Sequence, residues 1–406
     1  MNTPFRCETN SFQYALTGLR RDAISGRPAD IFSRAALEIF EQMDWDDWGY
    51  VFTQIFEPGV LQEIALLEGV DAQALSDLQA CSTPAGVWLR DQVGSAADLT
   101  VQRQINVASA LISISRFGLA RHLLGQATPR AESPRERFEL AWLEFLISNR
   151  CEDGANSSQA FEMMREAIRE GSIPPGRILD VCAQGVVWFT KRKEISEDAF
   201  RWCVSTGSHL SQTRSGLNAG ALSSWYRGIA MLPAAQGDAA GTRRYMRLAE
   251  DAAHETYSAR PTAFDLNTVK TYHESTIKEH MYVTGDLELA EAAAEALIAL
   301  DPVWSPSYGE LAEAYRKFGK VEKAANLYEQ ASSLGPPYVG YHLLQAARCR
   351  AQHNDDEVAL SHYIRLAEIA PGFRPVIDEG SEVATRASAS RRQLFMDTVE
   401  RRSSAS

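Results

Sequence analysis

The fold is decided by the stretch Tyr308-Gly-Glu-Leu311-Ala312-Glu-Ala-Tyr315-Arg-Lys-Phe-Gly319. Apolar residues recur in it at steps of three and four, which predicts one buried face of an α-helix. Its final glycine predicts the helix end, because the left-handed backbone that closes a helix suits a residue without a Cβ. A second helical pattern follows and is marked by Ala324, Tyr328, Ala331 and Pro336. We therefore predict two helices joined by a tight turn and ended by a proline.

This two-helix pattern recurs along the chain at a regular interval. Upstream, Gly285 precedes Gly319 by one interval. Ala290 precedes Ala324, and Pro302 precedes Pro336, by the same interval. Downstream, Cys349 follows Tyr315 by one interval. The residues that correspond to Ala324, Tyr328 and Pro336 lie one position later than this interval predicts, at Ala359, Tyr363 and Pro371. The turn Gln352-His-Asn-Asp-Asp is therefore predicted to carry one extra residue.

The repeating pattern resembles the tetratricopeptide repeat (TPR), a helix–turn–helix unit with a period of about 34 residues. The resemblance is clearest over residues 271–373. In such a repeat the small residues Ala312 and Ala324 lie where the two helices cross, because only a small side chain allows close approach. The resemblance implies an all-α fold, a right-handed superhelical solenoid of antiparallel helix pairs with an N-terminal helical region.

The rest of the chain keeps a helical texture without the clear period. We expect an N-terminal helical region (1–100), divergent TPR-like repeats (101–270), TPR repeats (271–373), and a C-terminal helix with a frayed tail (374–406). In the first region, Asp44-Trp-Asp-Asp-Trp-Gly-Tyr50 is predicted to begin a helix, since acids favour a first turn. Docking of a partner on these aromatic residues is the alternative.

Charge and composition narrow the classes of partner and compartment. The chain has 406 residues, of which 45% are hydrophobic and 23% charged, and a formal net charge of -12. An acidic surface repels nucleic acid and anionic lipid, so we expect neither nucleic acid nor a membrane as a partner. No signal-peptide pattern and no apolar run long enough to span a membrane occurs, and the six cysteines form no C-x-x-C pair. These features favour a cytoplasmic protein.

No catalytic or cofactor-binding motif stands out in the sequence. There is no Gly-rich phosphate loop and no nucleophile elbow. His273 and His280 lie two turns apart, about 10 Å along a helix axis, which is too far to share one metal ion. Cys203 stands among apolar residues and is predicted to be a core residue rather than a reactive thiol. We therefore predict no metal, no cofactor and no catalytic residue.

The resemblance also implies where a ligand binds, because the first helices of successive TPR units line a concave groove. On that basis the predicted binding residues are Tyr272, Glu279, Tyr282, Glu313, Arg316, Lys317 and Arg350. Three of them, Tyr282, Arg316 and Arg350, follow one another at steps of one repeat and are predicted to stack along one wall. The two guanidinium groups there suit an acidic group of a ligand.

One departure from the family concerns its chaperone-binding members, which hold a terminal carboxylate with Lys and Asn at set groove positions. This chain has Gly309 and Glu313 at the matching positions. Neither residue donates to a carboxylate through its side chain. The sequence therefore argues against a carboxylate clamp for chaperone tails.

Together these observations predict a non-catalytic scaffold or adaptor that binds a peptide or another protein in the concave groove. One alternative is a peptide-sensing regulator, similar to bacterial quorum-peptide receptors, which are also long helical-repeat proteins. The other is an enzyme, or an accessory subunit of one, with its chemistry in the divergent N-terminal half. The identity of the partner and the oligomeric state stay open.

Overall fold

The computed structural model describes residues 63–65, 77–113, 116–151, 153–192, 195–259, 263–302, 304–334, 338–369 and 374–403. Nearly all of these residues are helical and none of them forms a strand, which confirms the predicted all-α class. The acidic and aromatic cluster at 44–50, for which a helix start was predicted, lies outside the described residues.

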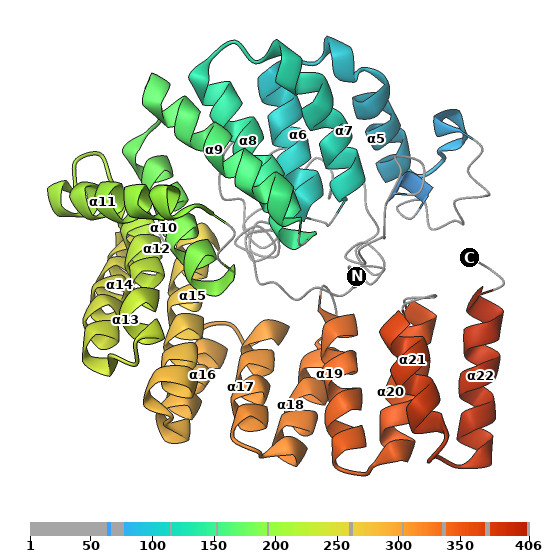
Figure 1. The fold of residues 1–406 in the computed structure, drawn as a ribbon. Helices are drawn as coiled ribbons and strands as arrows, with labels where there is room; N and C mark the ends of the chain where they lie inside the picture. Colours follow the sequence, from blue (N-terminus) through green and yellow to red (C-terminus); the bar gives the residue numbers. More distant parts are fainter. Residues whose placement is uncertain are drawn as a thin grey trace.

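The helices follow one another along a curve that is open on one side (Figure 1). A first arm contains α5 (Pro84–Gly94), α6 (Val101–Ser113), α7 (Phe117–Ala127), α8 (Pro134–Arg150) and α9 (Gly154–Glu170). A bend contains α10 (Pro175–Arg192), α11 (Glu197–Thr213), α12 (Ala219–Ile229), α13 (Met231–Ala235), α14 (Ala239–Ala259) and α15 (Ala263–Glu279). A second arm contains α16 (Leu287–Leu300), α17 (Ser305–Lys317), α18 (Val321–Ser333), α19 (Val339–Gln352), α20 (Asp356–Ile369), α21 (Arg374–Ala384) and α22 (Ala389–Ser403).

Short irregular turns lie between some of these helices. In the described part of the chain, 3₁₀ turns lie before α5 at Leu78–Ala80, and between helices at Ala96–Asp98 and Thr128–Arg130. The turn at His280–Thr284 is π-helical and continues α15 towards α16. Such a turn inserts a residue into a helix and widens it locally, and such turns are frequent at functional sites.

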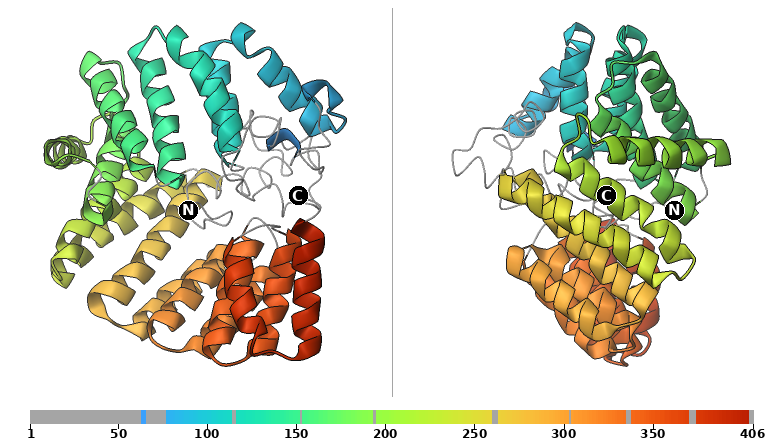
Figure 2. Two further views of the ribbon diagram at one scale, coloured as in Figure 1. Left: turned by 45° about the vertical axis from the view of Figure 1, so that its right-hand side comes forward. Right: turned by 90° about the vertical axis from the view of Figure 1, so that its left-hand side faces the viewer.

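Neighbouring helices pair and stack into a solenoid of two layers. The pairs are α6 with α7, α8 with α9, α10 with α11, α12 with α14, α15 with α16, α17 with α18, α19 with α20, and α21 with α22. The first helices of neighbouring pairs also pack on one another along the solenoid: α10 packs on α12, and α12 packs on α15. The turned views in Figure 2 show the two arms facing each other across this bend. The predicted solenoid of antiparallel helix pairs is confirmed.

The turns between paired helices follow the predicted glycine register. Gly285 and Gly319 have φ values of 65° and 76°, in the left-handed region. Asn354 takes the equivalent place with a φ of 64°, one position later than an unchanged period would put it. In both later turns the third residue past the helix donates back to it: Lys320 N–H to the Tyr315 carbonyl at 2.8 Å, and Asp355 N–H to the Arg350 carbonyl at 2.9 Å. This repeat does have one extra residue, but it lies in α19, which has 14 residues against 13 in α17. The two turns are equally long, so the prediction that the 352–356 turn carries the extra residue is wrong.

Helix starts in the described chain follow local sequence signals. Ser133 caps α8 by accepting from the Glu136 N–H, while the Glu136 carboxylate accepts from the Ser133 N–H at 3.0 Å. Asp286 caps α16 by accepting from the Leu289 N–H at 3.1 Å. Each cap satisfies a backbone donor that the helix itself leaves without an acceptor.

The core between the layers contains the small and aromatic residues of the predicted repeat. Ala312, Ala324 and Tyr328 are fully buried, as the pattern of the central repeat predicts. Cys203 is also fully buried among apolar side chains of α10 and α11, which confirms its prediction as a core residue. The first helices of five pairs (α8, α10, α15, α17 and α19) line one cavity, and the layer of first helices is called the inner helix layer.

Candidate binding site on the inner helix layer

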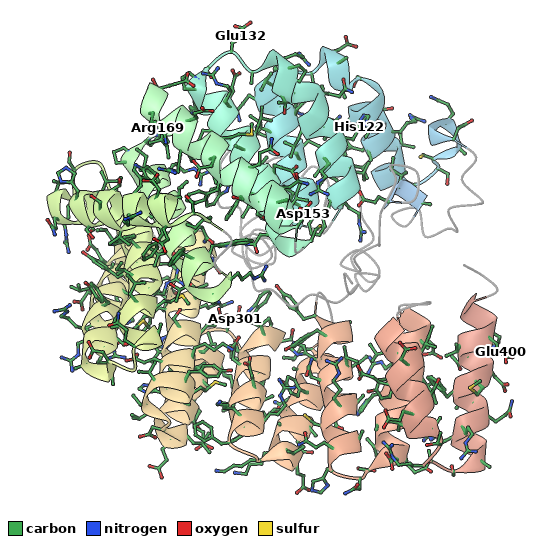
Figure 3. All side chains as sticks on the ribbon, viewed as in Figure 1. His122, Glu132, Asp153, Arg169, Asp301 and Glu400 are labelled. Carbon is green, nitrogen blue, oxygen red and sulfur yellow. The ribbon has the colours of Figure 1, made fainter. Side chains whose placement is uncertain are left out.

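A cavity of about 370 Å³ lies where the first helices of the bend meet those of the second arm. It is lined by Asn149 at the end of α8, by one face each of α10 and α17, by Lys278 of α15, and by Tyr341 and His342 of α19. Figure 3 draws the side chains on the ribbon, with the labelled Asp301 marking the connection into α17, at the end that faces the first arm. The curvature of the solenoid thus brings helices from five different pairs around one cavity.

The α10 wall is a single stripe of that helix. It contains Gln184, Val187, Trp188, Lys191 and Arg192, which recur at steps of three and four and therefore share one face. Trp188 is held by Phe145 of α8, with 5.1 Å between the ring centroids. The Arg192 guanidinium lies over the Trp188 ring at 5.2 Å from its centroid, a cation–π arrangement that fixes its position.

The α17 wall is a second stripe at the same helical spacing. It contains Pro306, Gly309, Glu310 and Glu313. The ammonium of Lys278, from α15, lies 2.8 Å from Glu310 Oε2 and 2.6 Å from Glu313 Oε2. One lysine therefore joins two carboxylates of the neighbouring inner helix.

The carboxyl groups of this wall have shifted pKa values. Burial raises the pKa of Glu310, and the nearby charge of Lys278 opposes that shift. Burial also acts on Glu313, but the ion pair with Lys278 and the hydrogen bond from Tyr282 outweigh it and lower the pKa of that group. Behind them, burial and the charge of Glu310 raise the pKa of Glu274 well above its usual value. Three carboxyl groups thus surround one ammonium group.

His342 lies between the α19 and α17 sides of the cavity and is fully buried. Its ring stacks on Tyr328 and meets Tyr338 and Tyr341 edge-on. Burial lowers its pKa to about 3, so the imidazole is neutral near pH 7. Neither ring nitrogen has a hydrogen-bond partner among the described residues.

Three of the predicted binding residues lie together beside the cavity. The Tyr282 hydroxyl, in the π-helical turn, donates to Glu313 Oε1 at 3.2 Å. The Lys317 ammonium lies 4.9 Å from the centroid of the Tyr282 ring. Tyr282 is 56% exposed, whereas Glu313 is half-buried and lines the cavity. These three residues form a continuous polar surface that leads from the turn to the cavity.

Two other predicted residues, Tyr272 and Glu279, are buried at the contact of α15 with α14. Arg243 of α14 donates to Glu279 Oε2 at 2.8 Å and to the Tyr272 hydroxyl at 3.4 Å. Only 2% of Tyr272 and 3% of Glu279 is exposed. Both side chains therefore hold two helices together and offer a ligand little surface.

The two predicted arginines point to different layers. Arg316 is exposed and donates to Gln345 of α19, an inner helix, at 3.0 Å. Arg350 instead donates to Glu329 Oε1 and Oε2 of α18 at 2.7 Å each, and to Asn326 at 2.6 Å. The expected stack of Tyr282, Arg316 and Arg350 along one wall is wrong for Arg350, because its flexible side chain reaches the second-helix layer. A binding role for the remaining residues stays a prediction.

Sequence reasoning missed the α10 stripe, Lys278, Glu310 and His342. The spacing of Gln184, Val187, Trp188, Lys191 and Arg192 was a visible signal of one polar and aromatic helix face. The divergent repeats carry no period, however, so that face could not be assigned to the inner layer. Lys278 and Glu310 belong to adjacent repeats, so their contact follows from the stacking of those repeats.

Comparisons with known proteins give a likeness of general architecture. No family model matches the chain, and no curated protein matches it. Among solved structures, the Assembly Chaperone of RpL4 (residues 1–338) is 14% identical with a TM-score of 0.35, and the match covers 73% of this chain and 99% of that one. A monomeric mutant of IFIT1 with Gppp-AAAA is 12% identical with a TM-score of 0.40, over 98% and 85%.

A third structure is a signal-transduction ATPase with a tetratricopeptide repeat sensor from Pyrococcus horikoshii. It is 12% identical with a TM-score of 0.40, and the match covers 98% of this chain and 66% of that one. At these identities and TM-scores the similarity is confined to general helical architecture.

No described helix is both long and apolar enough to cross a membrane. Among the described residues, no group of three or more His, Cys, Asp or Glu side chains is placed to hold a metal ion.

Proposed function

We propose that this chain is a non-catalytic scaffold of the TPR type, which binds a peptide or a segment of a partner protein on its inner helix layer. The observation that carries the proposal is the cavity between α10 and α17, lined by first helices from five pairs. An inner surface built by successive first helices is where helical repeat proteins present extended binding surfaces.

The chemistry of the cavity supports recognition of a polypeptide. Its aromatic groups, Trp188 and Tyr341, offer flat apolar surface, while Asn149 and Gln184 offer amide donors and acceptors. Convergence of a few polar groups on a cavity of several hundred Å³ is typical of ligand sites. The net charge of -12 favours a protein or peptide over nucleic acid as the occupant. We place this activity in the cytoplasm.

The proposal is tested by filling the cavity. Gln184→Trp adds a large side chain on the α10 stripe without changing charge. Ser205→Trp introduces the same side chain at an exposed position on α11, a second helix, also without changing charge, and is the control. Affinity capture from native extract with the wild-type chain should recover a partner that Gln184→Trp loses and Ser205→Trp keeps.

The comparison requires that both variants keep the helical far-ultraviolet circular dichroism of the wild type. Retention of the same partner by a folded Gln184→Trp variant would place binding elsewhere. Loss from both variants alike would show that the capture depends on general stability and not on the cavity.

A further inference from the structure

The two walls of the cavity carry opposite charge. Lys191 and Arg192 stand on the α10 stripe, whereas Glu310 and Glu313 stand on the α17 stripe. Burial raises the pKa of Glu310, and the positive charge of Lys191 across the cavity is one of the interactions that oppose this rise. The basic and acidic groups therefore belong to one electrostatic environment.

The acidic wall has more carboxyl groups than the local lysine neutralises. Lys278 pairs with both Glu310 and Glu313, so two carboxyl groups share one ammonium group. A second cation at this wall would be attracted by the carboxylates that share Lys278. The basic wall is pre-organised in turn, since Arg192 rests on Trp188 and Trp188 rests on Phe145.

The third feature is the imidazole of His342. A neutral imidazole has one N–H donor and one acceptor nitrogen. Both nitrogens lack a partner among the described residues, although the ring is fully buried and lines the cavity. Buried polar groups in proteins nearly always have a hydrogen-bond partner, so an isolated pair of ring nitrogens at a cavity indicates a polar group of a ligand.

We propose that the cavity binds a short peptide with free ends, with its ammonium group at Glu310 and Glu313 and its carboxylate at Lys191 and Arg192. A polar backbone group of the peptide is bonded by His342. The volume of about 370 Å³ is near the lower end for ligand sites, which limits the occupant to a few residues. This inference rests on the proposed function and names its ligand class.

The test uses the full chain and three equimolar libraries of synthetic tripeptides: with both ends free, N-acetylated, and C-amidated. Equilibrium dialysis followed by mass spectrometry measures retention of each library. The free library should be retained at least tenfold more than either blocked library, because each block removes one charge-assisted contact. Equal retention of the free and blocked libraries, or retention of none, overturns the inference.

Three substitutions assign the contacts. Glu310→Gln should abolish the preference for a free amino end, and Lys191→Met should abolish the preference for a free carboxyl end. His342→Phe should reduce retention of the free library about tenfold while both preferences remain; unchanged retention would make His342 a packing residue and remove it from the site. Arg201→Met is the control, because Arg201 is a 73% exposed cation on α11, and it should change neither preference.

Failure of this inference differs from failure of the proposed function. A partner that is captured by the wild type and lost by Gln184→Trp, with no tripeptide retained, supports the scaffold and rejects the short-peptide ligand. A captured partner that Gln184→Trp keeps rejects the scaffold site itself.

Discussion

Gly309 of α17 faces His342 of α19 so closely that a Cβ on the glycine would lie 2.7 Å from Cε1 of the imidazole. Real side chains do not approach that closely, so the ring occupies its place only because residue 309 has no side chain. The fully buried ring stacks among three tyrosines and has little freedom to withdraw. This contact therefore couples the α17 wall of the cavity to the position of His342.

Gly309→Ala should destabilise the protein, because the new methyl group forces the buried imidazole or α17 to shift. Overpacking of a core typically costs about 1–3 kcal/mol. Gly125→Ala is the control, since Gly125 is an exposed helical residue of α7 with nothing within 4 Å of its added Cβ. It should stabilise by about 0.5–1 kcal/mol through helix propensity. Urea unfolding of both variants measures the difference; a Gly309→Ala variant as stable as the wild type would contradict the packing described.

His342 should make stability depend on acidity. Its pKa is lowered by burial to about 3 in the folded chain, against an ordinary value of 6.5. Between these values the unfolded chain binds a proton that the folded chain does not, so the free energy of unfolding falls as pH decreases from 6.5. The contribution approaches about 1.4 kcal/mol per pH unit.

His342→Phe removes that proton-binding difference. The stability difference between wild type and variant, measured by urea unfolding from pH 7 to pH 4, should therefore move against the wild type as the solution is acidified. Both proteins contain the same carboxyl groups, so the effect of carboxyl protonation on the free energy of unfolding cancels in this comparison. Parallel profiles across that range would show that the imidazole is not buried in its neutral form.

Gly319→Val should destabilise the second arm. At a φ of 76°, a β-branched side chain is strained whatever space surrounds it, at a cost of about 1–2 kcal/mol or more. Gly319→Asn is the control, because Asn354 already holds the equivalent left-handed position in the next repeat. Thermal melting should show a clear loss for the valine variant and a smaller one for the asparagine variant. Equal losses would mean that backbone strain is not the cause.

Arg350→Ala should reduce stability more than Arg316→Ala. Arg350 makes a bidentate pair with Glu329, which His362 also contacts at 3.0 Å. Charge-assisted hydrogen bonds of this kind contribute about 1.5–3 kcal/mol. Arg316 is exposed and donates to one amide, so its loss should stay within about 0.5 kcal/mol. A larger loss for Arg316→Ala in chemical unfolding would reverse the assignment of the two arginines.

The turns of the second arm were predictable because their signals are local. A glycine or asparagine that ends a helix is read from a few neighbouring residues, so Gly285, Gly319 and the turn at Asn354 could be placed from the sequence. The extra residue of the last of these repeats was not placed correctly, because it lies in α19 and has no local signal. The boundaries near residues 100 and 270 have no such local signal and stay a prediction.

The candidate site was predictable only in part. Glu313 faces the cavity as its repeat position implied, but α10 meets α17 through the summed angles of several pairs, which no local pattern encodes. Arg350 could not be placed for a different reason. The repeat position predicts the location of its backbone, but the direction of its long side chain depends on its partner, Glu329, which the repeat pattern does not identify.

Crosslinking can locate the partner that we propose to occupy the cavity of the inner layer. The most direct measurement introduces the photo-crosslinking residue p-benzoylphenylalanine at Gln184 in one variant and at Ser205 in another, and maps the crosslinks by mass spectrometry after capture. Gln184 lines the cavity, whereas Ser205 is exposed on a second helix. We expect crosslinks to the captured partner from position 184 and none from position 205. Crosslinks from position 205 with none from position 184 would contradict the proposal.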